Sequence, residues 1–473
     1  MKKFNKDSYL KKLKLKRNWR RFSKYFCVGI PCVLCLVLGI YFAYSKFFVS
    51  KEQSVVRTTV GDFIYGDVVI NAYIDGEYSS TIPGKNDGYV VDKVSCDNGA
   101  VGKWNNDKWG LLTTNLSKRT KCNVYFKKVV SKVSDIIAQL DTTGKCPTMN
   151  ADGSVNVTGL EATNGYLCKA KDAYGDSYYY RGNVTNNYVK FADKYWRIVR
   201  INGDGTVRVI YDGTSAHANG ESSRDRQIGT SAFNSSYNDN AYVGYMYGQT
   251  GTSIYADAHA NTNNSTIKTY IDNWYKTNIV GTTNEQYLAD NVFCNGRSIS
   301  SNKPSTSSSY NNLGYGTNVT AYRWYYGPWE SGGYNSSMRL MCPQKNDAFT
   351  VSDITNGNGA LTYPVGLLSA DEIVLAGGWP AANSGYYLYS GQYWWASSPF
   401  DFTGNYARVR SIGSSGYANY SDYVNNNNGV RPVFNLKAEA LKYGDGTASN
   451  PYRLTESLDN SSSSESGGID TGD

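Results

Sequence analysis

Two short sequences near the carboxyl end decide the predicted fold: Tyr393-Trp394-Trp395-Ala396-Ser397-Ser398-Pro399 and Gly429-Val430-Arg431-Pro432-Val433-Phe434-Asn435-Leu436. Both are rich in aromatic and β-branched residues, which is typical of buried β-strands. Arg431 lies between Val430 and Pro432 in such a strand. We therefore expect Arg431 to be a structural arginine, paired inside the domain, in preference to a ligand contact.

The segment between these two strands is strongly polar. From Gly404 to Asn428, 17 of 25 residues are Gly, Asn, Tyr or Ser. Antibody combining sites have this composition, because Tyr provides a large contact area while Ser, Gly and Asn provide adaptable hydrogen bonds. The alternative is a set of plain surface loops, since Tyr is abundant in the whole chain, with 42 residues against 15 Phe and 10 Trp. We favour a binding surface.

The predicted contact surface combines the polar segment with the aromatic pair before it. Arg408 and Arg410 alternate with Val409, which indicates a strand with both arginines on one face. Trp394 and Trp395 are expected to form a platform beneath the surface. The predicted ligand-binding residues are Trp394, Trp395, Asn405, Tyr406, Arg408, Arg410, Tyr417, Asn419, Tyr420, Tyr423 and Asn426.

The two strand sequences also carry a resemblance. Together they resemble the closing part of C-type-lectin-like domains of the formylglycine-generating-enzyme, or sulfatase-modifying-factor, type, as found in uncharacterised exported proteins of Gram-positive bacteria. The resemblance implies an α+β fold with twisted antiparallel sheets, two short helices and long loops. Similar domains serve as the variable proteins of diversity-generating retroelements. Adenine-directed mutagenesis there yields the Asn, Tyr, Ser, Asp and Gly codons that dominate residues 405–428.

The amino-terminal residues explain the net charge. The chain has 473 residues and a formal net charge of +8, but residues 1–24 hold eleven basic side chains and one acid, so residues 25–473 carry −2. Residues 25–45 lack charge and are long enough for a transmembrane helix, which needs about 20 apolar residues. The positive-inside rule then predicts a single-pass cell-membrane protein with a cytoplasmic amino terminus and extracellular carboxy-terminal domains. A cleaved signal peptide ending near Ala43-Tyr44-Ser45 is the alternative. Because the basic charge is confined to this tail, the sequence gives no support to nucleic-acid binding.

The remaining chain is predicted to contain two folded parts. Residues 57–128 indicate a small all-β sandwich, in which Asp75-Gly76 favours a hairpin turn. Residues 129–141 indicate a helical spacer, residues 146–456 the C-type-lectin-like domain, and residues 457–473 a disordered Ser/Gly/Asp tail. Ser265 is expected to cap one helix, and Ser369 with Glu372 forms a capping box at the start of another.

Six cysteines follow the apolar stretch, and six cysteines allow 15 pairings. We expect sequence neighbours to pair within each predicted module, although free buried thiols are the alternative. The expected disulfide cysteines are Cys96, Cys122, Cys146, Cys168, Cys294 and Cys342.

Catalytic and metal chemistry find little support in the sequence. Only two histidines are present, His217 and His259, and no CxxC or GxSxG motif occurs. The resemblance implies formylglycine-generating chemistry through a reactive cysteine pair near the carboxyl end, but no cysteine follows Cys342. Paired carboxylates of a glycan hydrolase stay formally open. No cofactor or metal is expected, and structural calcium is left undecided because no regular calcium loop is present.

The function expected from the sequence is ligand binding at the cell surface. The partner would be a glycan or a protein on another cell, bound by the Tyr/Asn/Ser/Gly-rich surface, and the surface could be diversified by a retroelement. The alternative is a structural protein of the cell envelope that assembles with copies of itself.

Overall fold

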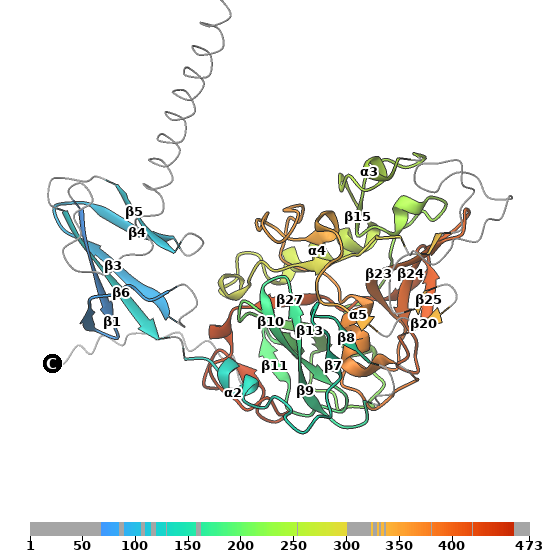
Figure 1. Cartoon of the computed structure of the whole chain (residues 1–473), viewed down its shortest axis with the longest axis horizontal. Helices are drawn as coiled ribbons and strands as arrows, with labels where there is room; N and C mark the ends of the chain where they lie inside the picture. The colour runs from blue at the N-terminus through green and yellow to red at the C-terminus, as the bar shows by residue number, and fades with distance from the viewer. Residues whose placement is uncertain are drawn as a thin grey trace, which may run out of the picture. The chain divides into compact units, whose positions relative to one another are not determined.

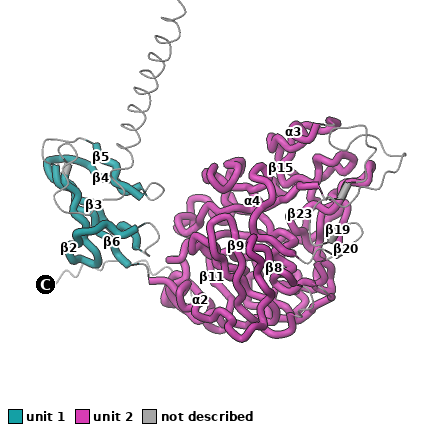
Figure 2. Tube along the Cα trace, in the orientation of Figure 1, with its two compact units in different colours: residues 1–129 teal, residues 130–473 magenta. Residues whose placement is uncertain are grey.

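The structure is a computed structural model of the chain. It describes residues 68–84, 89–105, 109–114, 120–128, 130–157, 162–252, 254–299, 323–324, 329–330, 333–334, 337–379, 381–418 and 420–457. The chain divides into two compact units, residues 1–129 and residues 130–473 (Figure 1 and Figure 2). Each unit has a hydrophobic core of its own.

The predicted single-pass membrane topology is corrected. Among the residues that the structure describes, none forms a helix long and apolar enough to cross a membrane. The longest, α4 at Thr266–Asn278, has 13 residues and spans about 20 Å, whereas a bilayer core is about 30 Å thick. The predicted basic tail (1–24) and apolar segment (25–45), and residues 458–473 of the predicted tail, lie outside the described residues.

Unit 1 is built from β-strands. Its four-stranded sheet has the order β2-β1-β6-β3, and a separate hairpin joins β4 to β5. The strands are β1 (Val68–Ile74), β2 (Glu77–Ser79), β3 (Tyr89–Cys96), β4 (Val101–Asn105), β5 (Gly110–Thr114) and β6 (Thr120–Lys128). Asp75 and Gly76, with φ of 49° and 92°, form the β1–β2 turn as predicted. β1 and β6 run parallel while β1 with β2 and β3 with β6 run antiparallel, so the sheet is mixed.

Unit 2 is organised around two sheets, and Figure 1 shows the strands of both within it. The first has seven strands along the order β27-β13-β12-β10-β9, with β11 beside β12 and β28 beside β11. These strands are β9 (Tyr166–Asp172), β10 (Gly175–Arg181), β11 (Tyr188–Phe191), β12 (Lys194–Ile201), β13 (Val207–Gly213), β27 (Val433–Leu436) and β28 (Tyr452–Arg453). The strand β27 belongs to the stretch Gly429 to Leu436 quoted above. It pairs with β13, which lies more than 200 residues earlier in the chain.

The second sheet contains the stretch Trp394 to Pro399, which is part of β23. Its order is β14-β26-β23-β24-β25, with β18 also paired to β23. The strands are β14 (Thr230–Ala232), β18 (Arg323–Trp324), β23 (Trp394–Phe402), β24 (Ala407–Ile412), β25 (Tyr420–Tyr423) and β26 (Asn427–Gly429). β25 is the edge strand on this path.

Short elements complete unit 2. The two-residue strands are β7 (Thr148–Met149), β8 (Val155–Asn156), β15 (Met246–Tyr247), β16 (Asn263–Asn264), β17 (Phe293–Cys294), β19 (Trp329–Glu330), β20 (Gly333–Tyr334), β21 (Ser337–Met338) and β22 (Ala348–Phe349). The α-helices are α2 (Val133–Ile137), α3 (Tyr255–Ala258), α4 and α5 (Ala370–Ile373), with a π-helical turn at Val374–Gly378 after α5. Short 3-10 helices lie at Arg224–Arg226, Asn240–Val243, Glu285–Tyr287, Lys345–Asp347 and Ala438–Ala440.

The predicted α+β, C-type-lectin-like fold class is wrong, because the chain is mostly β. Strands account for 36% and helices for 14% of the structure, and the four α-helices that it describes are short. The physical reason lies in composition: among the described α-helices only α4, whose apolar stripe contains Ile267, Ile271 and Tyr275, is longer than five residues. Elsewhere Gly, Asn, Ser and Tyr favour turns and strands.

Two local predictions are confirmed. Ser265 caps α4 by accepting a hydrogen bond from the Lys268 amide, and Ser369 with Glu372 forms the capping box of α5. The predicted spacer helix, as α2, buries Ile136 in the unit 2 core, and the Lys132 amide donates to the Leu441 carbonyl. The segment around α2 therefore forms part of unit 2.

Three disulfides join the cysteines that are neighbours in sequence: Cys96–Cys122 in unit 1, and Cys146–Cys168 and Cys294–Cys342 in unit 2. The first links directly opposed residues of β3 and β6. Each bond closes a loop and so restricts the unfolded chain. In the chain-entropy model, loops of this length correspond to a stabilisation of roughly 3–4 kcal/mol for each disulfide.

Candidate functional site

The polar segment 404–428 forms part of the second sheet of unit 2. Its strand β24 pairs with β23 on one side and with β25 on the other, both antiparallel. Opposed residues on neighbouring strands lie on the same face of a sheet. Arg408 is opposite Tyr423 and Ser411 is opposite Tyr420, so the two tyrosines of β25 lie on opposite faces of the edge strand.

Five tyrosines around this edge are exposed. Tyr237, Tyr393, Tyr406, Tyr420 and Tyr423 have exposed fractions between 38% and 46%. We call these five residues the tyrosine surface. Three of them, Tyr406, Tyr420 and Tyr423, are among the predicted ligand-binding residues, whereas Tyr237 and Tyr393 are not. Tyr237 lies in a segment, 234–240, with the same Asn/Ser/Tyr composition as residues 404–428, and this signal could have located it.

The tyrosines contact one another in two groups. In the first group, Tyr237 stacks on Tyr406 with ring centroids 5.3 Å apart, and Tyr406 contacts Tyr423 at 5.0 Å. In the second, Tyr420 contacts Tyr393 at 5.8 Å and the half-buried Tyr417 at 6.0 Å. Large aromatic rings held by their neighbours lose little rotamer entropy when they bind a partner.

The first group is fixed to the scaffold by backbone hydrogen bonds. The amide of Ala407 donates to the carbonyl of Tyr237 at 2.7 Å, so the loop that carries Tyr237 is attached to the start of β24. The amide of Val424 in turn donates to the carbonyl of Ala407 at 3.1 Å, which connects β24 to the end of β25. Three segments distant in sequence therefore present their tyrosines together.

The predicted tryptophan platform is buried. Trp394 and Trp395 are 1% and 0% exposed and belong to the hydrophobic core. The indole nitrogen of Trp395 donates to the carbonyl of Ser231 at 2.8 Å, and the guanidinium of Arg431 lies 5.0 Å from the ring of Trp394. Their large apolar area stabilises the fold, and they lie too deep to touch a surface ligand.

The two predicted contact arginines also have internal partners. Arg408 forms a bidentate ion pair with the buried carboxylate of Asp401 and stacks 5.1 Å from Phe400. Arg410 is fully buried, with its guanidinium 4.9 Å from the same ring. As predicted from the alternation, both lie on one face of β24, where Arg410 is fully buried and Arg408, with a side chain 24% exposed, is held by Asp401.

The loop between β24 and β25 has a fixed conformation. Gly416 has φ of 79°, and a Cβ atom there would lie 2.3 Å from the carbonyl oxygen of Asn383. The amide of Ala418 donates to the carbonyl of Gly378 at 2.9 Å. Gly416 is thus required by close backbone packing.

The predicted asparagines lie at the edges of this region. Asn405 and Asn426 are exposed, and the amide nitrogen of Asn426 donates to Asp422 at 2.5 Å. Asn419 is outside the described residues.

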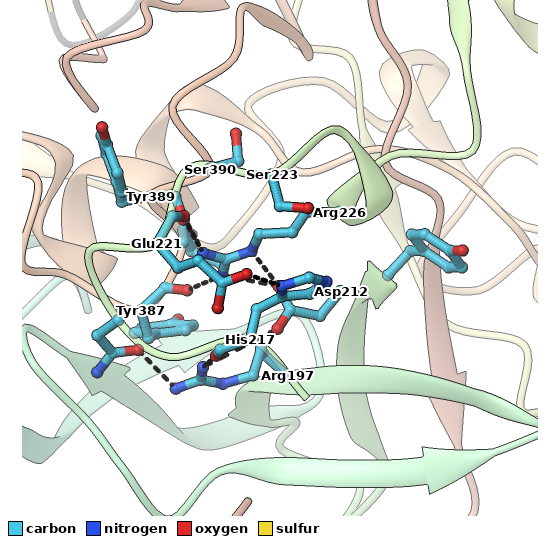
Figure 3. Close-up of polar contacts among 12 residues, drawn as sticks. Arg197, Asp212, His217, Glu221, Ser223, Arg226, Tyr387, Tyr389 and Ser390 are labelled. Carbon is cyan, nitrogen blue, oxygen red and sulfur yellow. Dashed lines mark hydrogen bonds and ion pairs between the residues drawn. The ribbon is translucent and has the colours of Figure 1, made fainter. Parts of the chain in front are cut away.

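A second polar cluster lies in the interior of unit 2 (Figure 3). The carboxylate of Asp212 is surrounded by the guanidinium groups of Arg197, Arg226 and Arg431, at 4.0, 2.7 and 3.0 Å, and all four side chains have no exposed surface. We call these four residues the arginine cluster. The prediction that Arg431 is a structural arginine is therefore confirmed.

The remaining donors of the arginine cluster bind backbone carbonyls of loops. Arg226 donates to the carbonyls of Tyr387 and Tyr389, and Arg431 donates to that of Leu388 at 2.7 Å. Arg197 donates to the carbonyl of Val184 at 2.7 Å. Burial lowers the pKa of Arg431, as does the neighbouring positive charge of Arg226, while Asp212 opposes both effects. The cluster fixes two irregular segments, around Val184 and at 387–389, to the first sheet.

Next to this cluster, His217 bridges two carboxylates. Its Nδ1 lies 2.6 Å from Glu221 and its Nε2 lies 2.9 Å from Asp225 (Figure 3). The hydrogen bond from His217 lowers the pKa of Glu221. The Asp225 carboxylate also accepts a bond from the Thr214 amide, so the bridge closes the loop 214–225 upon itself.

The described residues contain no group of three or more His, Cys, Asp or Glu side chains that could hold a metal ion. The Asp204 carboxylate in the Gly203-Asp204-Gly205 sequence accepts bonds from the amide and the hydroxyl of Thr206, which is the geometry of a turn. Cys294 and Cys342 are joined to each other.

Comparison with known proteins gives one match. Residues 333–438 match the model of a family described as a domain of unknown function (DUF6273). This range contains α5, β23 to β27 and every member of the tyrosine surface except Tyr237. Searches of curated proteins and of solved structures found no match. The matched description does not mention a C-type-lectin-like or formylglycine-generating domain, so that resemblance remains a prediction.

Proposed function

We propose that unit 2 is a binding module that recognises a glycan or protein partner through the tyrosine surface. The observation that carries this proposal is the exposure of five tyrosines, which contact one another in two groups on a scaffold fixed by backbone hydrogen bonds. Aromatic rings in water gain free energy when a partner covers them, at roughly 25 cal/mol per Å² of apolar area. The three disulfides suit an extracellular location, where such a partner would be met.

The tyrosine surface favours a ligand that is bound by short-range packing and hydrogen bonds over one that is bound by its charge. Arg408, the basic residue nearest the exposed rings in register, is paired with Asp401. The proposed ligand is therefore held by ring stacking and by hydrogen bonds to tyrosine hydroxyl and asparagine amide groups. Binding should accordingly depend weakly on salt concentration.

The test is a triple variant, Tyr406→Ala with Tyr420→Ala and Tyr423→Ala, assayed on a glycan array and on a panel of cell surfaces. Binding should fall by at least about tenfold, because each anchor ring contributes on the order of 1–2 kcal/mol. The matched control is Tyr78→Ala with Tyr443→Ala, which removes two exposed tyrosines outside the tyrosine surface. Unchanged binding by a folded triple variant would refute the placement.

Retroelement diversification, if it acts on this chain, should be confined to exposed positions. Within 405–428 these include Asn405, Tyr406, Tyr420 and Tyr423, whereas Gly416 is fixed by packing. Related strains should differ at the exposed codons and agree at the fixed one, and a near-copy of the coding DNA should lie beside a reverse-transcriptase gene. Strains identical at the exposed codons, with no such copy, would remove this part of the proposal.

A second candidate function is self-assembly, and one observation favours it. β25 is an edge strand, and the outer backbone groups of an edge strand can pair with another chain. Copies joined through β25 would form oligomers without an added ligand. Light scattering of the purified protein separates the two: oligomers that disappear on introducing Ser421→Pro support assembly, and a monomer at all concentrations excludes it.

A further inference from the structure

Unit 2 contains a pocket that lies on different elements from the tyrosine surface. Its volume is about 240 Å³, and its walls come from residues 139–141, the start of β9, the end of β10 and the loop 183–186. Drug-sized ligands occupy pockets of roughly 300–1,000 Å³, so this pocket suits a smaller molecule, of the size of one sugar ring.

The pocket has a buried base and an exposed rim. Leu167, Tyr180 and Val184 are buried at the base, while Gln139 and Asn183 are exposed at the rim. This gradation gives a ligand access from solvent and a partly desolvated position once it has entered. Hydrogen bonds gain strength in such surroundings.

The walls are rigid. Leu140 pairs with Leu167, the amide of Asp141 donates to the carbonyl of Leu167 at 2.9 Å, and the adjacent Cys168 is held by its disulfide to Cys146. A Cβ atom on Gly165 would lie 2.6 Å from the carbonyl oxygen of Asn183, so the opposite wall approaches closely at that point. A pocket that is already formed does not lose conformational entropy on binding.

The hydroxyl of Tyr180 favours a polar ligand. Tyr180 lines the pocket and is 2% exposed, and its hydroxyl has no hydrogen-bond partner among the described residues. Burying a hydroxyl without a partner costs about 1–3 kcal/mol. Three other buried tyrosines, Tyr179, Tyr386 and Tyr387, share this property, but none of them lines the pocket.

The charges around the pocket exclude ionic ligands. No Lys or Arg belongs to the lining, so nothing there holds an anion. The one acid, Asp141, accepts bonds from the amides of Thr143, Lys145 and Cys146 and from the Thr143 hydroxyl. These bonds, the Thr143 hydroxyl first, lower the pKa of Asp141 to about 2 and fill its acceptor positions. A cation would find no vacant carboxylate oxygen.

The other polar groups suit a neutral polyol. The side-chain oxygen of Asn183 accepts from Asn219 at 2.6 Å, which orients the Asn183 amino group as a donor. The amino group of Asn186 donates to Gln139 at 2.7 Å, which leaves the Asn186 oxygen as an acceptor. The half-buried ring of Tyr166 offers an apolar face, and a sugar ring has both hydroxyl edges and apolar C–H faces.

From this geometry we propose that the pocket binds one neutral sugar residue, with the Tyr180 hydroxyl and the Asn183 and Asn186 amides holding sugar hydroxyl groups. The site is independent of the tyrosine surface, because it is made by other strands and loops. It would allow unit 2 to hold one sugar of a glycan even if the tyrosine surface binds something else.

The experiment titrates the full chain with D-glucose, D-galactose, D-mannose and N-acetyl-D-glucosamine, followed by saturation-transfer NMR, with inorganic phosphate as the ionic probe. At least one hexose should bind in a saturable manner, and phosphate should not. Tyr180→Phe should raise the Kd about tenfold, the value of one good hydrogen bond. Tyr179→Phe is the matched control, because it removes an equally buried hydroxyl that does not line the pocket, and its Kd should be unchanged.

Three results would overturn the proposal: no hexose binds, phosphate binds in place of hexoses, or Tyr180→Phe leaves the Kd unchanged. If Tyr180→Phe fails to fold, Asn183→Ala on the exposed rim decides instead, because the same loss of hexose affinity is expected there. Failure of this proposal is distinguishable from failure of the binding function proposed for the tyrosine surface, since Tyr406, Tyr420 and Tyr423 remain intact in all these variants.

Discussion

The arginine cluster and the tyrosine surface are both parts of unit 2, yet their side chains differ in burial and in the partners that they contact. Around Asp212 three arginines are fully buried, and each donates to carboxylate or carbonyl oxygens from distant segments. At the edge strand β25, tyrosines lie partly in water and contact mainly one another. In the cluster a lost partner leaves a buried charge unpaired, whereas on the surface water replaces what is lost. The difference teaches that polar character alone does not distinguish a structural residue from a binding residue.

The largest effect is expected from Asp212→Asn. This change removes the carboxylate that pairs with three buried guanidinium groups. The free energy of unfolding should fall by about 3–5 kcal/mol, measured by urea denaturation. The control is Asp176→Asn, which breaks an exposed pair with Lys169 and should change stability by less than about 1 kcal/mol. Equal effects of the two substitutions would contradict the contrast drawn here.

The buried His259 makes the stability of the fold depend on pH. Burial, with the positive charge of Arg297 next, lowers the pKa of His259 to about 2 from its usual value near 6.5. The folded chain therefore binds this proton less readily than the unfolded chain. The stability contributed by neutral His259 is complete above pH 6.5 and is lost progressively as the pH falls toward 2.

Between pH 7.5 and pH 5 the loss from His259 should reach about 2 kcal/mol. Denaturation curves over this window measure it. His259→Gln should flatten the pH dependence, since glutamine does not titrate. A slope that is the same in the wild-type chain and in the variant would show that His259 is not the group responsible.

Gly416→Ala tests whether the scaffold of the tyrosine surface is rigid. A Cβ at a left-handed residue with φ of 79° costs about 1–2 kcal/mol, and contact with Asn383 adds to this. The thermal midpoint should fall. Gly76→Ala is the matched control, since its φ is 92° but a Cβ there meets nothing within 4 Å. A smaller fall of the thermal midpoint for Gly416→Ala than for Gly76→Ala would mean that the loop around Gly416 changes its conformation to accept the Cβ.

The smallest change in stability is expected from Tyr406→Ala. The ring is exposed and surface substitutions usually alter stability by less than about 0.5 kcal/mol. The same substitution should weaken ligand binding, so stability and binding should separate at this residue. If Tyr406→Ala destabilised the chain as much as Asp212→Asn, the tyrosine would be structural.

Features that depend on nearby residues were predictable. The capping box of α5 needs only Ser369 and Glu372, three positions apart, and the α4 stripe needs only its own spacing. The neighbouring cysteines paired as expected because each pair lies within one unit. The fold class was not predictable in this way. A resemblance in two strand sequences suggested an α+β fold, while the intervening chain forms mostly strands.

The candidate site was predictable only in part. Composition located Tyr406, Tyr420 and Tyr423, but it could not separate them from Trp394 and Arg410, which have the same contact-forming character and are buried. Exposure depends on which strand covers a face, and that is set by pairing between β23, β24 and β25. Tyr237 joins the surface because a backbone hydrogen bond attaches its loop to β24.

The sequence by itself determined the local elements of this protein: its helix caps, the turn at Asp75-Gly76 and a segment rich in contact-forming residues. Only the tertiary structure decided which of those residues meet solvent. It also brought Arg197, Arg226 and Arg431 to one carboxylate. The physical reason is range, because caps and turns are set by interactions over a few residues, whereas burial and charge pairing are set by distant segments, such as those of Asp212 and Arg431, 219 residues apart, that meet only in the folded chain.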